Sequence, residues 1–189
     1  MTAERAYHHG DLRRAVLTAA LDVISAEGPA ALSLRDLARR AGVSHAAPAH
    51  HFKDRAGLLT AIAVEGYDLL SAALGEAEDL RGLGVRYVHF ATAHPAHFQV
   101  MFRPELLRPD DPELLAARER TRGRLRAAVA GYADDPAVGF MAAWSMAHGF
   151  ATLLLSRNLD GPLDGRDPEE VFRALTYEMF QPGEKPAAG

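Results

Sequence analysis

The sequence predicts an all-α chain in which an N-terminal three-helix head with a helix-turn-helix is joined by a long helix to a C-terminal helical domain. Three observations predict this fold class. Apolar residues recur at spacings of three and four along most of the chain, as in helices packed on one face. No convincing strand pattern is present. Residues 33–55 contain two short helical patterns separated by Gly42, which is the arrangement of a helix-turn-helix.

Composition indicates an ordinary globular protein. The chain has 189 residues, of which 48% are hydrophobic and 24% are charged, and this suits one or two domains with a real core. Cysteine is absent, so no disulfide framework or thiolate chemistry is expected. The first ten residues hold no apolar run typical of a signal peptide, and no segment is expected to reach the apolar length that crosses a membrane. We therefore expect a cytoplasmic location and no membrane contact.

Charge is distributed unevenly along the chain. The net charge is −4, yet the residues through Thr60 carry eight Lys and Arg against six Asp and Glu. The remainder carries thirteen against nineteen, and five of the nine histidines lie in the first part. The N-terminal part is therefore mildly basic and the remainder is acidic. A basic N-terminal part is consistent with binding to nucleic acid, but a charge difference this small does not establish it.

The first helix is expected over residues 11–27. Its apolar residues form one stripe: Leu12, Ala15, Val16, Ala19, Ala20, Val23 and Ile24. The run Glu27-Gly28-Pro29 ends this helix because glycine and proline both interrupt a helical pattern.

The helix-turn-helix follows. Ser33 and Asp36 form a potential capping box, and Gly42 stands where a helix end favours positive φ. Ser44 is expected to cap the second short helix, and Phe52 to anchor its end in the core. The first turn of that helix presents His45, Ala46 and Ala47, which occupy positions that usually meet base edges, while Lys53 and Arg55 are placed for phosphate contact. The alternative is an ordinary helical hairpin inside an all-α core.

Further helices complete the chain. Their expected ranges are 55–74, 83–93, 95–102, 113–132, 136–159 and 168–180. The helix over 136–159 is apolar on most faces, so it is expected to be the most buried. The expected domains are residues 1–55, residues 56–180 and a flexible tail over 181–189.

Several residues in the C-terminal part are candidates to line a ligand cavity, if the chain has one. His148 lies on the most apolar helix near Trp144, so it could supply a polar group in an apolar cavity, or it could be a core or dimer-seam histidine. The full set of pocket candidates is His89, His97, Phe98, Met101, Phe102, Trp144 and His148. The apolar members are equally consistent with a simple core.

Catalytic and metal sites have little support in the sequence. His94 and His97 are three residues apart and could share a metal, but Pro95 lies between them and no cysteine is available. We find no phosphate-binding glycine loop, nucleophile elbow or supported carboxylate pair. We therefore expect no catalytic residue, no metal and no cofactor. A helical metal-dependent enzyme that uses these histidines is kept as one alternative function. The arginines that alternate over residues 118–126 are expected on a solvated surface.

The head resembles the TetR/AcrR family of transcriptional regulators. The matching segments are Tyr7 to Arg13, Glu27 to Pro29, Leu32 to Ser44, His50 to Arg55, and Leu58-Leu59. They cover about the first third of the chain. A shorter match, Trp144 to Gly149, resembles the regulatory domain of one subgroup of that family.

The resemblance implies an all-helical homodimer that binds a double-stranded DNA operator, most often as a repressor released by a small-molecule effector. It implies pairing of subunits through the helices over 136–159 and 168–180. Carried onto this chain and combined with the motif, the DNA-binding candidates are Arg35, Ser44, His45, Ala46, Ala47, His50, Lys53 and Arg55.

One position departs from the family pattern. Ala49 stands where the family usually has an aromatic residue, most often a tyrosine that contacts the DNA backbone. The first alternative is therefore a regulator-like protein that binds a ligand or partner but has weak or no specific affinity for DNA.

Overall fold

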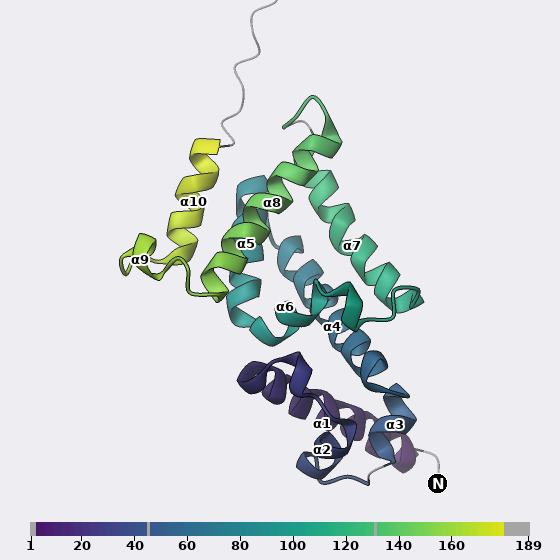
Figure 1. Cartoon of the computed structure of the whole chain (residues 1–189). Helices are drawn as coiled ribbons and strands as arrows, with labels where there is room; N and C mark the ends of the chain where they lie inside the picture. Colours follow the sequence, from purple (N-terminus) through teal and green to yellow (C-terminus); the bar gives the residue numbers. More distant parts are fainter. Residues whose placement is uncertain (1–2, 45, 131, 180–189) are drawn as a thin grey trace, which may run out of the picture. The chain divides into compact units, whose positions relative to one another are not determined.

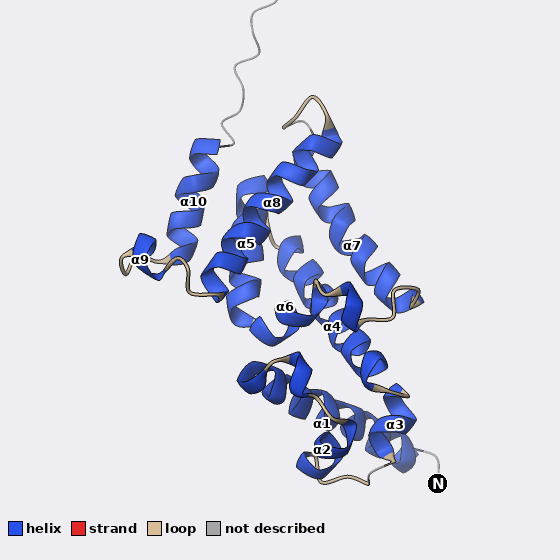
Figure 2. Cartoon of the chain, viewed as in Figure 1, coloured by secondary structure: helices blue, strands red, loops and turns tan. Residues whose placement is uncertain are grey.

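The fold is a chain of helices, and the described residues, 3–44, 46–130 and 132–179, contain no strand (Figures 1 and 2). The coordinates are a computed structural model. The helices are α1 (Ala3–Glu27), α2 (Leu34–Arg40), α3 (Ala47–Phe52), α4 (Arg55–Gly75), α5 (Leu80–Ala93), α6 (Pro95–Met101), α7 (Pro112–Val129), α8 (Pro136–Leu155), α9 (Asp160–Leu163) and α10 (Pro168–Met179). Two short 3₁₀ helices, η1 (Pro29–Ala31) and η2 (Pro104–Leu106), join them. The all-α prediction is confirmed.

The chain divides into two compact units. The first includes described residues within 1–67 and 94–118, and the second those within 68–93 and 119–189. The helices α4 and α7 contribute residues to both units.

In the first unit, α1, α2 and α3 pack around a small apolar core. The α1 stripe supplies Val16, Ala20, Val23 and Ile24, all buried as the spacing predicts. Leu37 of α2 and Phe52 of α3 lie in the same unit with almost no exposed surface. Helix α1 begins at Ala3, eight residues before the expected start, because no proline or glycine pair interrupts the chain there.

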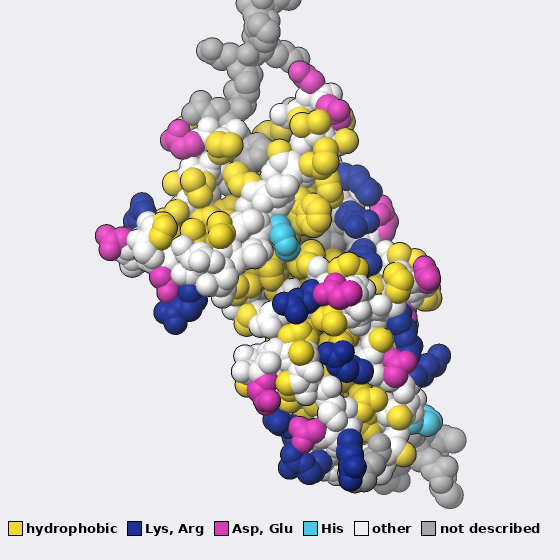
Figure 3. Space-filling model, in the orientation of Figure 1, with side chains coloured by type: hydrophobic (Ala, Val, Ile, Leu, Met, Phe, Trp, Pro, Cys, Tyr) yellow, Lys and Arg dark blue, Asp and Glu magenta, His cyan; other side chains and the backbone are white. Residues whose placement is uncertain are grey.

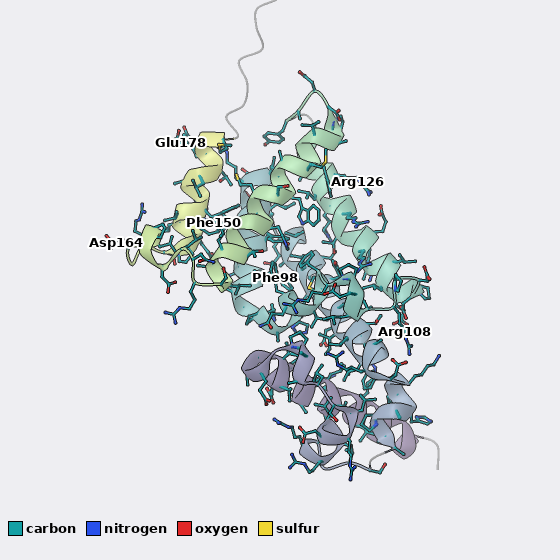
Figure 4. All side chains as sticks on the ribbon, viewed as in Figure 1. Phe98, Arg108, Arg126, Phe150, Asp164 and Glu178 are labelled. Atoms are coloured by element: carbon teal, nitrogen blue, oxygen red, sulfur yellow. The ribbon has the colours of Figure 1, made fainter. Side chains whose placement is uncertain are left out.

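In the second unit, α5 packs against both α8 and α10. Phe172 of α10 is fully buried, and its ring centroid lies 5.0 Å from that of Phe150 on α8. Figure 4 labels Phe150 on the side of α8 toward α10. Gly84 of α5 permits this packing, since a Cβ there would stand 2.8 Å from Cε1 of Phe172.

Helix α8 is not the most buried helix, so that expectation is wrong. Val138, Met141 and Leu153 are 54%, 55% and 45% exposed, and Figure 3 shows apolar side chains lying open over α8. Its composition makes nearly every face apolar, but the described part of the chain covers α8 chiefly with α5 and, at Phe150, with Phe172 of α10, and leaves much of the helix open.

Two helices are long and apolar enough to cross a membrane by length and composition, contrary to the expectation that none would be. In α4, 56% of the apolar window is buried inside the structure, which is typical of a core helix. In α8 the buried share is 22%, which leaves most of that window open in a single chain.

Other differences concern helix ends. Helix α5 begins at Leu80, where Asp79 accepts a hydrogen bond from the backbone N–H of Gly82, three residues before the expected start. Helix α8 ends at Leu155 rather than at residue 159, and the short helix α9, which was not expected, lies between α8 and α10.

Candidate functional site

The turn between α2 and α3 has the predicted geometry. Gly42 adopts φ +66°, a conformation that residues with a Cβ rarely enter. The backbone N–H of Val43 donates to the carbonyl of Ala38 at 3.0 Å and closes the end of α2. The positions of both short helices therefore agree with the helix-turn-helix prediction.

The capping box predicted at the start of α2 is not formed. Ser33 is the N-cap residue, but its side chain makes no capping hydrogen bond. The carboxylate of Asp36 accepts from Arg39 and Arg40 instead, at 2.5 Å each. These arginines lower the pKa of Asp36, because charged donors stabilise its ionised form.

Helix α3 presents a small exposed surface. Its N-cap residue is Ala46 rather than Ser44, whose carbonyl accepts from the N–H of Ala47 at 3.0 Å. Pro48 occupies a first-turn position, where the missing N–H costs little, and is buried. Ala49 and His50 are exposed.

The other predicted base-facing residues are placed as follows. Ser44 and Ala46 are exposed and Ala47 is half-buried, while His45 lies outside the described residues. Exposed small side chains permit a close approach to DNA bases.

The turn between α3 and α4 is strained. Lys53 has φ +68° and ψ −59°, and the N–H of Asp54 donates to the carbonyl of Phe52 at 2.9 Å. Together these define a γ-turn of the positive-φ form, which is rare for a residue with a side chain and costs on the order of 1–3 kcal/mol. A Cβ on Gly57 would lie 2.0 Å from the Phe52 carbonyl oxygen, so only glycine fits there.

Arg55, a predicted phosphate ligand, is partly used inside the protein. Its Nη2 donates to the carbonyl of Pro29 at 2.6 Å. Its Nε is buried and has no hydrogen-bond partner among the described residues. Lys53, the other predicted phosphate ligand, is exposed.

Basic side chains lie on the exposed side of α2. Arg35, Arg39 and Arg40 are exposed, and Figure 3 shows Lys and Arg side chains gathered over this helix. Since Arg39 and Arg40 share Asp36, Arg35 is the α2 arginine for which the structure shows no acidic partner among the described residues.

The predicted pocket residues fall into both compact units. His97, Phe98, Met101 and Phe102 belong to the first unit. In that unit the Phe98 and Phe102 ring centroids are 5.1 Å apart (Phe98 is labelled in Figure 4). Tyr67 of α4 donates its hydroxyl to the Met101 carbonyl at 3.0 Å, a contact that sequence reasoning missed because 34 residues separate the two.

His97 is the buried histidine of the first unit. Its Nε2 lies 3.8 Å from a carboxylate oxygen of Glu65, which is too long for a hydrogen bond, and it has no other partner among the described residues. Burial lowers the pKa of His97 and outweighs the opposing effect of Glu65, while nearby His94 lowers it further. His97 is therefore neutral at pH 7.

His89, Trp144 and His148 belong to the second unit. The hydroxyl of Tyr87 on α5 lies 2.8 Å from Nδ1 of His148. The sequence did not predict Tyr87 as a site residue. The Trp144 ring is tilted beside the same imidazole, with 5.7 Å between the ring centroids. Burial lowers the pKa of His148, so the neutral ring is the stable form. His89 is more exposed and pairs with Glu169 at 2.7 Å.

The arginines of α7 are largely exposed, as predicted, but several have partners. Arg118 lies over the ring of Tyr67, 5.7 Å from its centroid, and Arg120 pairs with Asp68 at 2.5 Å. Arg126, labelled in Figure 4, pairs with Glu119 at 2.6 Å. Each of these three arginines therefore contacts a different partner.

No group of three or more His, Asp or Glu side chains among the described residues could hold a metal ion.

The α2–turn–α3 unit, with exposed α3 side chains and a basic α2 surface, defines a helix-turn-helix protein. Residues 16–62 match the family of bacterial regulatory proteins described as the tetR family, and residues 80–179 match the tetracyclin repressor-like C-terminal domain. The chain belongs to the TetR family of transcriptional regulators.

Solved structures agree with this assignment. A protein of unknown function from Rhodococcus sp. RHA1 is 35% identical, with 92% of this chain and 96% of that chain covered and a TM-score of 0.75. The TetR family transcriptional regulator PfmR from Thermus thermophilus is 26% identical, with 87% and 96% covered and a TM-score of 0.67.

A third similar structure contains ligands. It is AibR in complex with isovaleryl coenzyme A and operator DNA, which is 19% identical, with 90% and 98% covered and a TM-score of 0.65. None of the curated proteins matches this sequence.

Proposed function

We propose that this regulator is a cytoplasmic homodimeric repressor that binds a roughly palindromic operator and is released by a small molecule. The observation that carries the proposal is the exposed surface of α3, held on a buried core by Phe52. Family membership supports residues 1–55 as the DNA-binding part and residues 56–180 as the regulatory part, whereas residues 181–189 lie outside the described residues.

The DNA contacts divide into two kinds. Ala46, Ala49 and His50 are exposed on or beside α3, on the surface that would face base edges in a major groove. Lys53 and Arg35 supply positive charge for the phosphates on either side of that groove. Arg55 contributes chiefly by fastening α4 to η1, since its Nη2 is bound to Pro29.

The dimer surface is the open side of α8 together with α10. Val138, Ser145 and Gly149 recur at helical spacing on the exposed side of α8, and Leu175 and Met179 are exposed on α10. An apolar surface of this kind on a single chain is typical of a protein interface. A second copy of the chain, applying the same surface, would bury it.

The effector site that we propose includes Tyr87 and His148. A neutral imidazole bonded to a phenol offers one oriented polar group beside the apolar Trp144. His97 and Phe102 of the first unit remain further candidates. Because AibR binds isovaleryl coenzyme A, that compound is a reasonable first probe, and displacement of bound DNA is the readout.

The decisive experiment is selection of bound sequences from a random duplex pool, followed by anisotropy titration at two salt concentrations. A two-fold symmetric motif bound far more tightly than random DNA is expected. Weak binding with the same salt dependence for every sequence would mean that only phosphate attraction operates. That outcome would favour the alternative of a ligand-binding protein without a specific operator, which Ala49 makes worth testing.

The dimer needs its own test. We expect Val138→Asp, on the exposed α8 surface, to give monomers in sedimentation and to lose operator affinity. Leu115→Asp is the matched control, because Leu115 is a similarly exposed apolar residue on α7. Equal sedimentation of the two variants as dimers would contradict the proposed interface.

A further inference from the structure

We infer that Arg108 is a positioning residue for DNA binding, because it fastens the strained turn that sets the direction of α3. The inference rests on the proposed function, since it assigns a role within operator binding. Arg108 lies between η2 and α7, 54 positions after Asp54, and Figure 4 labels it.

Arg108 is fixed at both its side chain and its backbone, within one compact unit. Its Nη2 donates to Oδ2 of Asp54 at 2.9 Å. Its guanidinium carbon would lie 3.1 Å from a Cβ on Gly57, so the group rests directly on that glycine. Its backbone N–H donates to the buried hydroxyl of Thr60 at 3.0 Å.

Asp54 connects these contacts to the turn. Its Oδ1 accepts from the N–H of Gly57 at 2.8 Å and begins α4, while its own N–H closes the γ-turn around Lys53. The N–H of Gly57 and then Arg108 hold the pKa of Asp54 below its usual range, so the carboxylate is charged at neutral pH. Arg108 therefore fixes the residue that follows the strained position.

The strain at Lys53 requires such a constraint. A side-chain residue in this conformation keeps it only when the surroundings fix the backbone on both sides. On the α3 side, the N–H of Lys53 is bonded to the Ala49 carbonyl. On the α4 side, the fixing groups are Gly57 and Arg108. Relaxation of Lys53 to negative φ would turn the end of α3 relative to α4.

The segment that carries Arg108 is itself anchored. Leu107 is buried, and Oδ1 of Asp111 accepts from the N–H groups of Glu113 and Leu114, which fixes the start of α7. Arg108 is thus presented to Asp54 from a defined backbone rather than from a free loop.

The size of the effect is limited by the exposure of the ion pair. The Arg108 and Asp54 side chains are 34% and 61% exposed. Pairs this exposed shift an equilibrium by at most about fivefold. We therefore expect a loss of operator affinity of about three- to fivefold on removal of the Arg108 side chain, and no loss of the fold.

The test is a double-mutant cycle on the turn, with the operator duplex obtained by selection. Arg108→Ala is measured in two backgrounds, Lys53→Ala and Lys53→Gly. Both backgrounds lack the lysine charge, but only glycine adopts positive φ without strain. We expect Arg108→Ala to weaken operator binding about three- to fivefold with Lys53→Ala and less than about twofold with Lys53→Gly.

Salt dependence separates positioning from direct contact. Loss of a phosphate contact lowers the slope of log affinity against log salt by about one, whereas loss of a positioning residue leaves the slope unchanged. Unfolding midpoints of all four variants show whether lost binding reflects lost folding. Arg108→Lys, which keeps the charge, is expected to recover part of the affinity.

Each outcome separates the two proposals. An equal loss of affinity in both backgrounds, a reduced salt slope, or a loss that only follows unfolding would overturn the role of Arg108 and leave operator binding intact. A selection that enriches no duplex would overturn the proposed function, and the positioning role with it.

Discussion

Gly84 of α5 and Phe172 of α10 are in direct contact, with room for no side chain between them. A Cβ at residue 84 would lie 2.8 Å from Cε1 and 3.3 Å from Cζ of the fully buried Phe172 ring. The ring cannot move away freely, because Phe150 lies against it at a centroid distance of 5.0 Å. The contact fixes how closely α5 and α10 approach.

We expect Gly84→Ala to lower the free energy of unfolding by about 1–3 kcal/mol, which is typical of an overpacked core. Urea unfolding followed by circular dichroism measures it. Phe172→Leu in the same chain makes room for the added methyl group, so the double variant should lose less than the sum of the single losses. Strict additivity would show that the two residues are not coupled.

Gly149 tests whether α8 faces another subunit. A Cβ at this position has no heavy atom of the described chain within 4 Å outside its own helix. In an isolated chain, Gly149→Ala should stabilise the helix by up to about 1 kcal/mol. Against a closely packed partner it should weaken dimerisation about tenfold, which sedimentation at several concentrations measures.

Gly123→Ala on α7 is the matched control, because a Cβ there also meets nothing within 4 Å. It should give the helical gain without any change in dimerisation. Dimerisation that is unchanged in the Gly149 variant as well would place the subunit interface elsewhere.

His97 should make the free energy of unfolding depend on pH. Burial holds its folded-state pKa below the ordinary value of 6.5, whereas the unfolded chain titrates normally. Stability from this residue is fully present above about pH 6.5 and is lost as the pH falls toward the folded pKa, since only the unfolded state gains the proton there. Glu65 opposes this shift and limits its size.

The measurement is urea unfolding between about pH 7.5 and about pH 5, with His97→Gln as the comparison. The variant should lose less stability over this range than the parent, because glutamine does not titrate. The pKa of His148 is shifted in the same direction, so His148 accounts for part of the pH dependence that remains in the His97→Gln variant. Parallel pH profiles of parent and variant would contradict a neutral buried His97.

Ala49 should limit the affinity for DNA. It is exposed on α3 where the family usually carries a tyrosine. Ala49→Tyr adds a hydroxyl that can donate to a phosphate, and one such bond contributes about 1 kcal/mol, or about fivefold in affinity. Anisotropy titration of the selected duplex measures the gain, and Ala49→Phe supplies the ring without the hydroxyl. Equal affinities for the two variants would exclude that hydrogen bond.

Local signals predicted the head well. Gly42, the buried stripe of α1 and the aromatic anchor Phe52 each express a rule that acts within a few residues, and the structure has all three. The capping box failed for an equally local reason, because Arg39 and Arg40 compete for Asp36 and provide charged donors.

Long-range relationships could not be predicted from the sequence. Tyr87 and His148 are 61 positions apart, and Arg108 and Asp54 are 54 apart, with no pattern that pairs them. The apolar sequence of α8 indicated burial, but periodicity does not say whether a face is buried within the chain or against another molecule. Hence α8 was expected to be covered when much of it is open.

If the open surface of α8 pairs two subunits as proposed, operator occupancy depends steeply on how much of this regulator the cell makes. When two chains must pair before both recognition helices can reach one operator, operator occupancy at low protein levels rises with the square of the subunit concentration. Doubling synthesis would then raise occupancy about fourfold in that regime. A modest change in expression would then give a sharper change in operator occupancy without any effector.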